Sequence, residues 1–262
     1  MRFIKNIGII GAGKMGTTIL NGLKGLHQYK LSYYNPSPRN FDQTIYAYSS
    51  VEQLITNNDV LFLCTLPSQV KSVLSPYQPL FKNKMLVSVA AGLSIKEIQD
   101  TVGKECKVIR TMPNTPCKVN KGIIAYSLGE NIDSSDEILT KLMLSSMGVS
   151  RKVDEKLMDP ISGLSGSGPA YVCLFVEALA DGGVRAGIPR DLAYELACHT
   201  LIGTASMILE TKQHPGSLKD EVSSPGGATI EGIFHLEQSG LRYSVMQAVL
   251  ASSTKCKSFS SS

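Results

Sequence analysis

The stretch Ile7-Gly8-Ile9-Ile10-Gly11-Ala12-Gly13-Lys14-Met15-Gly16 decides the fold of this chain. Its first four residues form the apolar run of a buried strand, and a G-x-G-x-x-G pattern follows directly and opens a helix. In that context the first glycine allows a tight turn, the second lets the backbone approach a pyrophosphate, and the third lets the helix pack on the strand. The alternative is a tight turn without a ligand. We predict that the whole pattern binds a dinucleotide: Gly11, Ala12, Gly13, Lys14, Met15 and Gly16.

Outward from this stretch, apolar runs alternate with helical patterns through the first half of the chain. Further strands are predicted at residues 31–34, 60–64, 85–89, 107–110 and 122–126, and helices at 15–26, 51–55 and 94–101. Runs that are apolar throughout indicate strands covered on both faces. Strands separated by helices indicate βαβ units. The predicted fold class is therefore α/β, with an N-terminal Rossmann-like, mostly parallel sheet domain.

Beyond about residue 155 the strand pattern ends and helical spacing takes over. Helices are predicted at 171–186, 191–212 and 228–238, with a short segment at 216–222 before the third. A last helix starts near Leu241, and a frayed serine-rich tail follows at 258–262. The boundary falls near Asp159-Pro160. The prediction is a dinucleotide-binding domain at 1–159 and an all-helical C-terminal domain at 160–262.

Composition excludes several classes of protein. Of 262 residues, 43% are hydrophobic, which excludes a disordered chain, and 18% are charged, a low share that hints at a large buried interface. The net charge is only +4 and the basic residues are scattered along the chain, so the sequence shows no basic cluster of the kind that binds nucleic acid. No run of about 18 apolar residues predicts a membrane span, and the N-terminus reads as a strand and not as a signal peptide. Six cysteines without C-x-x-C spacing predict no metal site and a reducing compartment, most simply the cytoplasm.

The loop after the second predicted strand addresses the choice of cofactor. An acidic residue there would bind the 2′-hydroxyl of NAD, but this chain has Asn35, Ser37 and Arg39 around two prolines. These side chains can donate hydrogen bonds or add positive charge, and no carboxylate repels a phosphate. We therefore predict NADP(H) in preference to NAD(H). The alternative is an ordinary proline-rich loop with Arg39 in solvent.

Three more loops follow predicted strands, where open parallel sheets bind ligands. The first holds Thr65, Leu66 and Pro67, and the second holds Ala90, Ala91 and Gly92, whose small side chains would let a nicotinamide ring lie close to the backbone. The third holds Asn114 between two prolines. We predict that these residues contact the cofactor, although each loop alone is equally consistent with ordinary loop punctuation.

The helical half contains a glycine-rich turn that leads into a helix. Such a turn exposes several N–H donors where the helix dipole favours an anion, and the first half already supplies a phosphate site. A small carboxylate substrate fits this second turn, with a hydroxyl at Thr229 able to contact a neighbouring nitrogen or oxygen. A capped helix with conformational glycines explains the turn equally well. The residues concerned are Ser224, Gly226, Gly227, Ala228 and Thr229.

No Ser/His/Asp arrangement, H-E-x-x-H or Walker A lysine is present. Reduction of a carbon–nitrogen double bond needs no strong side-chain base, because a protonated imine is already electrophilic and the cofactor carries the difficult chemistry. The protein then mainly holds two partners in register.

Several short blocks of sequence are distributed over nearly the whole chain. They are the pattern from Gly11 to Gly16, RTMPNTP (110–116), LSGSGPAY (164–171), ADGG (180–183), GIPR (187–190), HPG (214–216), LKD (218–220) and SPGGATI (224–230). Together these blocks resemble the pyrroline-5-carboxylate reductase family.

The resemblance implies an NAD(P)H-dependent reduction of 1-pyrroline-5-carboxylate to L-proline, the last step of proline biosynthesis. It also implies that Ser224, Gly226 and Gly227 hold the substrate carboxylate and that Thr229 is the catalytic residue contacting the ring nitrogen. The helical domain would form an intertwined homodimer that shares active sites, with further assembly into rings, commonly decamers. One departure stands out: where the family often has Val-Lys-Pro, this chain has Thr65-Leu66-Pro67, so a basic residue near the cofactor is absent.

Two other functions are consistent with part of the pattern. A β-hydroxyacid dehydrogenase shares the two-domain plan but typically relies on a lysine in a long interdomain helix, and residues 169–186 contain none. A non-catalytic dinucleotide sensor would bind the cofactor without turnover. The intact substrate turn at 224–229 disfavours that alternative.

Overall fold

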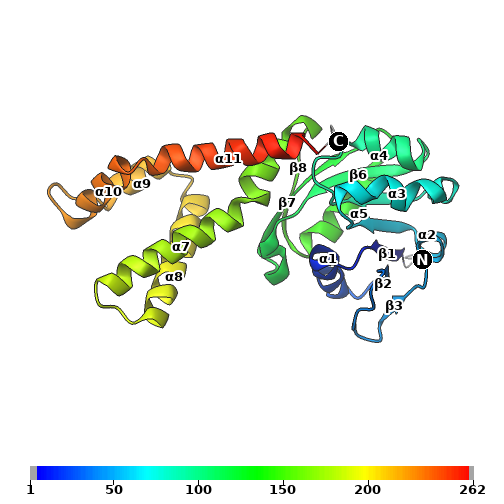
Figure 1. Ribbon diagram of the computed structural model, residues 1–262, viewed down its shortest axis with the longest axis horizontal. Coiled ribbons are helices and arrows are strands. Elements are labelled where there is room, and N and C mark those ends of the chain that lie inside the picture. Colours follow the sequence, from blue (N-terminus) through cyan, green and yellow to red (C-terminus); the bar gives the residue numbers. More distant parts are fainter. Residues whose placement is uncertain (1–4, 260–262) are drawn as a thin grey trace. The chain divides into compact units, whose positions relative to one another are not determined.

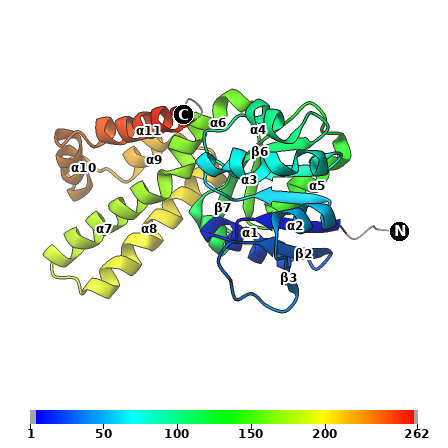
Figure 2. The ribbon, with the colours of Figure 1, turned by 45° about the vertical axis from the view of Figure 1, so that its right-hand side comes forward.

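A computed structural model describes residues 5–259 of the chain. The first part of the predicted N-terminal strand, residues 1–4, and the end of the predicted tail, residues 260–262, lie outside the described residues. The described chain forms two compact units (Figures 1 and 2). The first comprises residues 5–167 together with 250–259, and the second comprises residues 168–249. The domain boundary after residue 159, predicted from the end of the strand pattern, stays a prediction.

The first unit is built on an eight-stranded sheet in the order β3-β2-β1-β4-β5-β6-β7-β8. Every neighbouring pair is parallel except β6 and β7, so the predicted mostly parallel sheet is confirmed. The strands are β1 (Lys5–Ile10), β2 (Tyr29–Tyr34), β3 (Ile45–Ala47), β4 (Val60–Leu63), β5 (Met85–Ser88), β6 (Lys107–Met112), β7 (Gly122–Leu128) and β8 (Gly148–Lys152).

Helices link these strands. The α-helices of the first unit are α1 (Lys14–Lys24), α2 (Val51–Asn57), α3 (Val70–Leu74), α4 (Ile95–Val102), α5 (Ser134–Ser145) and α6 (Met158–Ile161). Short 3₁₀ turns are η1 (Pro67–Gln69), η2 (Ser75–Phe81), η3 (Thr115–Val119) and η4 (Glu155–Leu157), and η5 (Ser162–Gly166) is a π-helical turn.

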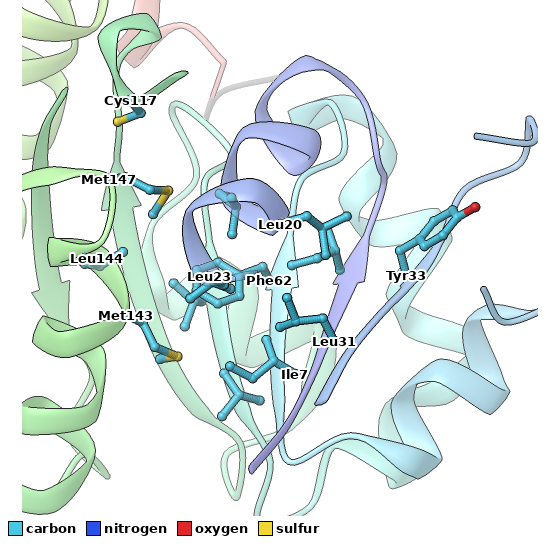
Figure 3. Close-up of a cluster of buried hydrophobic side chains, with 14 of the residues drawn as sticks. Ile7, Leu20, Leu23, Leu31, Tyr33, Phe62, Cys117, Met143, Leu144 and Met147 are labelled. Atoms are coloured by element: carbon cyan, nitrogen blue, oxygen red, sulfur yellow. The ribbon is translucent and has the colours of Figure 1, made fainter. Parts of the chain in front are cut away.

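The sheet is buried on both faces, as the continuous apolar runs predict. Successive residues of β4 enter different cores: Val60 and Phe62 pack with Leu20 and Leu23 of α1, whereas Leu61 and Leu63 pack with side chains of α2, α3 and α4. Helix α5 also covers the α1 face, through Met143 and Leu144 (Figure 3). Burying two apolar layers explains why these strands lack the polar alternation of a half-exposed sheet.

Five strands and α-helices of this unit are absent from the sequence-based prediction: β3, α3, α5, α6 and β8. Strand β3 has only three residues, and two of them are exposed. Strand β8, of sequence GVSRK, buries Ser150 alone and is polar at its end. Helix α5 begins at a capping box in which Asp133 accepts from the backbone N–H groups of Ser135 and Asp136. A capping box is a sequence signal for the start of a helix, but a prediction based on apolar spacing does not use it.

The second unit is helical throughout its described length. It contains α7 (Gly168–Arg185), α8 (Arg190–Thr211), α9 (Pro215–Glu221), α10 (Ala228–Gln238) and the first part of α11 (Leu241–Lys257). Helices α7 and α8 run side by side (Figure 1). The four predicted helices are confirmed, and the short segment predicted at 216–222 proves to be a fifth helix, α9.

This second unit has almost no core of its own. Its buried hydrophobic side chains are three alanines and one leucine: Ala180, Ala193, Ala197 and Leu218. Large apolar side chains stand exposed instead, with Leu209 at 73% and Ile202 at 62% on α8. Exposed apolar surface on this scale marks a face that another surface covers.

Helix α8 is also long and apolar enough to cross a membrane by length and composition, with a mean hydropathy of 1.3 over its best window. A single helix of this kind is weak evidence for a span, because core helices of soluble proteins and signal sequences pass the same test. The helix carries charged residues at its start, Arg190 and Asp191.

Candidate active site

A hollow of about 800 Å³ opens at the carboxyl ends of the parallel strands. It lies where the chain order reverses, because β1 pairs with β2 on one side and with β4 on the other. Five strands in turn contribute residues at or just past their ends: Ile10, Tyr34, Cys64, Val89 and Pro113. This crevice outside a switch point is where open α/β sheets bind their ligands.

The glycine pattern forms the floor of this hollow. Gly11 has a φ of +93°, and its amide donates to the carbonyl of Tyr34 at 2.9 Å. A Cβ on Gly16 would lie 2.2 Å from the carbonyl oxygen of Gly11, so this residue lets α1 start against the turn. A Cβ on Gly13 would meet no atom within 4 Å, which leaves open space above the start of α1. Gly11, Gly13, Lys14 and Met15 line the hollow, whereas Ala12 and Gly16 are buried.

The loop after β4 supplies a second wall. Thr65, Leu66 and Pro67 all line the hollow, and their contact with the cofactor stays a prediction. The Thr65 hydroxyl is buried and has no hydrogen-bond partner among the described residues. An orphaned hydroxyl in the wall is costly unless a ligand accepts or donates there, so this wall fits a polar cofactor. Burial raises the pKa of the neighbouring Cys64 thiol, which therefore stays a neutral side chain.

The loop after β2 is only partly at this hollow. Asn35 lines it, but the Asn35 amide donates to the carbonyl of Ser37 at 2.8 Å and so shapes its own loop. Arg39 lines a neighbouring hollow of about 520 Å³ instead. The Tyr33 hydroxyl donates to the carbonyl of Arg39 at 2.9 Å, and the Tyr33 ring packs edge-on to Phe41. These contacts fix the backbone of the arginine while its side chain remains exposed.

The loop after β5 reaches the hollow through Ala90 and Ala91. Its Gly92 lies just outside: a Cβ there would lie 2.7 Å from the carbonyl oxygen of Cys256, so the end of α11 packs on this loop. The Ser88 hydroxyl accepts from the amide of Ala90 at 3.2 Å and steadies the turn.

Asn114 holds the neighbouring loop in place. Its side-chain oxygen accepts from the amide of Ile123 at 3.1 Å, and its amide donates to the carbonyl of Ser165 at 3.2 Å. Asn114 is buried and does not line the hollow, whereas Pro113 does. The structure thus gives its side chain a positioning task between β7 and the π-helical turn, and the predicted direct contact with the cofactor stays a prediction.

A buried ion pair ties the strands to the elements behind these loops. Arg110 of β6 is 4% exposed and contacts Asp159 of α6 at 2.6 Å and Glu155 at 3.4 Å. Glu155 also accepts from the amide of Ile95, the first residue of α4, at 2.7 Å. One arginine therefore links the start of the helix that follows Ala90–Gly92 with the helix that leads to Ser165.

Sequence reasoning missed several lining residues. The side of the hollow away from the glycine turn is formed by residues of η1, α3 and η2, including Gln69, Ser72, Val73, Pro76 and Tyr77. They follow β4 within one short connection. The available signal was their position just beyond a predicted strand, but no residue type in this segment points to a ligand.

The predicted substrate turn lies in the second unit and is described by itself. Gly227 precedes α10 and its amide donates to the carbonyl of Ser224 at 3.0 Å, so the turn is closed on itself. Ala228 and Thr229 are the first two residues of the helix, and both are exposed. Free N–H groups at the first turn of an eleven-residue helix can receive an anion.

Two family models match the chain. The model described as pyrroline-5-carboxylate reductase dimerisation matches residues 155–259, and the model described as NADP oxidoreductase coenzyme F420-dependent matches residues 6–92. The first covers the helical unit, and the second covers the sheet from β1 to the loop after β5.

Full-length relatives extend this likeness. The pyrroline-5-carboxylate reductase of Glycine max is 42% identical over 97% of this chain and 96% of its own length. That of Escherichia coli is 38% identical over 96% of each chain. The crystal structure of the Plasmodium falciparum pyrroline carboxylate reductase with NADP bound superimposes with a TM-score of 0.93 at 36% identity, covering 99% of both chains.

Proposed function

The chain belongs to the pyrroline-5-carboxylate reductase family, and on that premise we propose that it reduces 1-pyrroline-5-carboxylate to L-proline with a reduced nicotinamide dinucleotide, the last step of proline biosynthesis. The observation that carries the proposal is the hollow at the β1/β4 switch point, floored by the glycine turn and walled by the loops after β2, β4, β5 and β6. Relatives named pyrroline-5-carboxylate reductase, which match this chain over nearly their full length, support this substrate.

The residues of the hollow fit a dinucleotide. The open space above Gly13 leaves room for a pyrophosphate beside the first amides of α1, and Lys14 adds a positive charge there. The orphaned Thr65 hydroxyl can bond a polar group of the cofactor, and Ala90 and Ala91 leave space for a flat ring.

We assign NADPH as the preferred form. No carboxylate follows β2, so nothing there repels a 2′-phosphate, and the relative from Plasmodium falciparum has NADP bound. Arg39 and the polar side chains of Asn35 and Ser37 lie on the loop that follows β2.

For the substrate, the turn before α10 supplies the binding groups. The amides of Gly226 and Gly227 and the hydroxyl of Ser224 would hold the carboxylate, with Ala228 at the first helical position. Thr229 would hydrogen-bond the ring nitrogen and so orient the carbon–nitrogen double bond. When bound, the reduced dinucleotide would supply a hydride to the carbon of the protonated imine, whose nitrogen keeps its proton and becomes the amine of proline. The task left to the chain's own residues is to bind and orient the two molecules.

The direct test mixes purified protein, 1-pyrroline-5-carboxylate and either NADPH or NADH, follows absorbance of the dinucleotide, and identifies the product. We expect L-proline, with a higher kcat/KM for NADPH. Binding of the dinucleotide without its oxidation would refute the reaction and favour the non-catalytic sensor.

A substitution at Thr229 tests the assigned role. Thr229→Ala should lower kcat by roughly tenfold or more with little change in the Kd of NADPH, because only a contact near the reacting atoms is lost. Thr229→Ser, which keeps the hydroxyl, should retain most of the activity. An equal loss of turnover and NADPH affinity in Thr229→Ala would contradict the role.

The helical unit makes a homodimer through the apolar faces of its helices, a proposal supported by the matched dimerisation model and by its lack of a core. Assembly of dimers into larger rings such as decamers is the further proposal from family resemblance. All six cysteines are free thiols, which supports a reducing compartment, and we propose the cytoplasm.

A further inference from the structure

The second hollow beside the glycine turn is strongly basic. It shares Gly13 and Lys14 with the larger hollow and adds the side of α1 together with Arg39 and Lys118. Three cations from three separate segments thus converge on one space of about 520 Å³, and none of the described residues lining it is acidic. The described structure shows no ion pair at any of the three, whereas Lys24, at the far end of α1, pairs with Asp42 at 2.7 Å.

Lys118 is the member of this trio that the motifs do not explain. It lies on η3, whose Cys117 is 1% exposed and packs into the same core as α1 (Figure 3). The turn is also held by Asn114, which accepts from Ile123, and by a bond from the amide of Lys121 to the carbonyl of Pro116 at 3.1 Å. The backbone that carries this exposed lysine is therefore anchored, as is that of Arg39.

The larger hollow lacks the charge that an additional phosphate needs. Among the described residues that line it, Lys14 alone is charged. A phosphate monoester carries nearly two negative charges and three acceptor oxygens, and it is bound well by converging Lys and Arg side chains. The space where such charges gather adjoins the larger hollow at Gly13 and Lys14.

We propose that Lys118 is a specificity-determining residue: with Arg39 and Lys14 it receives the 2′-phosphate of NADP(H), which projects from the larger hollow into the basic one. This rests on the proposed use of NADPH. The proposal extends the phosphate contacts beyond the loop after β2 to η3, the turn that follows β6.

The effect of the 2′-phosphate can be isolated by comparing the binding of two nucleotides. Adenosine 2′,5′-bisphosphate carries the 2′-phosphate, and 5′-AMP does not. Binding of each is measured by calorimetry to the wild-type protein, Lys118→Ala, Lys118→Arg and the control Lys24→Ala. We expect Lys118→Ala to weaken the bisphosphate about five- to tenfold and to leave AMP unchanged. Lys118→Arg should keep the affinity because it keeps the charge, and Lys24→Ala should match wild type.

Added salt gives an independent readout. The affinity of wild type for the bisphosphate should fall with ionic strength more steeply than that of Lys118→Ala, because one charge contact is absent in the variant. Unchanged bisphosphate affinity in Lys118→Ala, or an equal loss for both nucleotides, would overturn the proposal.

Failure of this proposal is distinct from failure of the proposed function. If wild type binds both nucleotides equally, Lys118 has no such role, while formation of proline can still be measured with NADH. If Lys118→Ala selectively loses the bisphosphate but no proline forms, the phosphate site stands and the assigned reaction falls.

Discussion

Gly13 and Gly16 are the same residue type three positions apart, yet the space around them differs. A methyl group on Gly16 would collide with the carbonyl oxygen of Gly11, whereas one on Gly13 would enter open space. The fold therefore requires a glycine at position 16, whereas at position 13 it leaves open space.

This difference makes a prediction. Gly16→Ala should destabilise the protein by about 2 kcal/mol or more, because backbone must move to relieve the contact. Gly13→Ala should unfold at the wild-type denaturant concentration and yet bind NADPH at least about tenfold more weakly, because the methyl group occupies the space of the pyrophosphate. Chemical denaturation and calorimetry separate the two effects. Normal NADPH affinity in Gly13→Ala would count against the proposed position of the cofactor.

The buried thiols give the stability a dependence on alkaline pH. Burial raises the pKa of Cys106 from its usual 9.0 to about 12, and it raises that of Cys64 as well. Between these values the folded protein binds more protons than the unfolded chain, so the free energy of unfolding should fall as the pH rises from 9 toward 12.

Urea unfolding at about pH 8 and about pH 10.5 measures this fall. The double variant Cys64→Ala/Cys106→Ala should show a smaller fall than wild type, because it removes both thiols from the linkage. In the folded protein, iodoacetamide should leave Cys64 unmodified near pH 8 even though it lines the larger hollow. An equal fall in both proteins would show that other groups cause it.

Among the elements, β6 and α6 are joined by a buried ion pair as well as by the apolar contact of Met112 with Met158. The Arg110 side chain is 5% exposed and that of Asp159 is 20% exposed. Removing one partner of such a pair leaves a largely buried charge uncompensated.

Arg110→Met should therefore lower the free energy of unfolding by about 3 kcal/mol. The control is Lys24→Ala, which removes an ion pair whose side chains are 43% and 47% exposed and should cost less than about 1 kcal/mol. Equal effects of the two substitutions in denaturant unfolding would show that the Arg110 pair is no stronger than a surface pair.

The elements also show where sequence reasoning succeeds. Strands β1 and β4 were predictable because both faces are buried, so every residue in the run is apolar. Strands β3 and β8 were not, because tertiary pairing at the sheet edges holds short or polar segments that have no pattern of their own. The capping box at Asp133 could have predicted the start of α5, but a prediction from apolar periodicity does not detect it.

The candidate site divides in the same way. That the glycine turn and the loop at 65–67 lie at the hollow could be predicted from the sequence, because a motif marks the first and the end of a strand marks the second. The position of Arg39 in a second hollow and the presence of Lys118 beside it depend on which loops meet around α1. One-dimensional spacing carries no information on that meeting.

At the scale of the whole molecule, the helical unit depends on association. Its exposed apolar side chains on α8 would be covered in a homodimer, which predicts a mass of about twice 28.2 kDa in solution. Ile202→Glu should shift the protein toward the monomer, because a charge would enter the interface.

The matched control is Ile138→Glu, which changes an isoleucine that is 69% exposed on α5 of the first unit. Sedimentation velocity measures both variants. A fully dimeric Ile202→Glu would place the interface away from this face of α8.

The first unit is assembled from two separate parts of the chain, since residues 250–259 return to it after the helical unit. In that returning segment, the Cys256 thiol lies 3.0 Å from the Ser162 hydroxyl, and the Ser252 hydroxyl lies 2.7 Å from that of Ser167. On the ribosome, the nucleotide-binding part therefore remains unfinished until residues 250–259 have been translated. A premature stop that spares all eight strands would still release a protein whose cofactor unit is missing the piece that packs against Gly92.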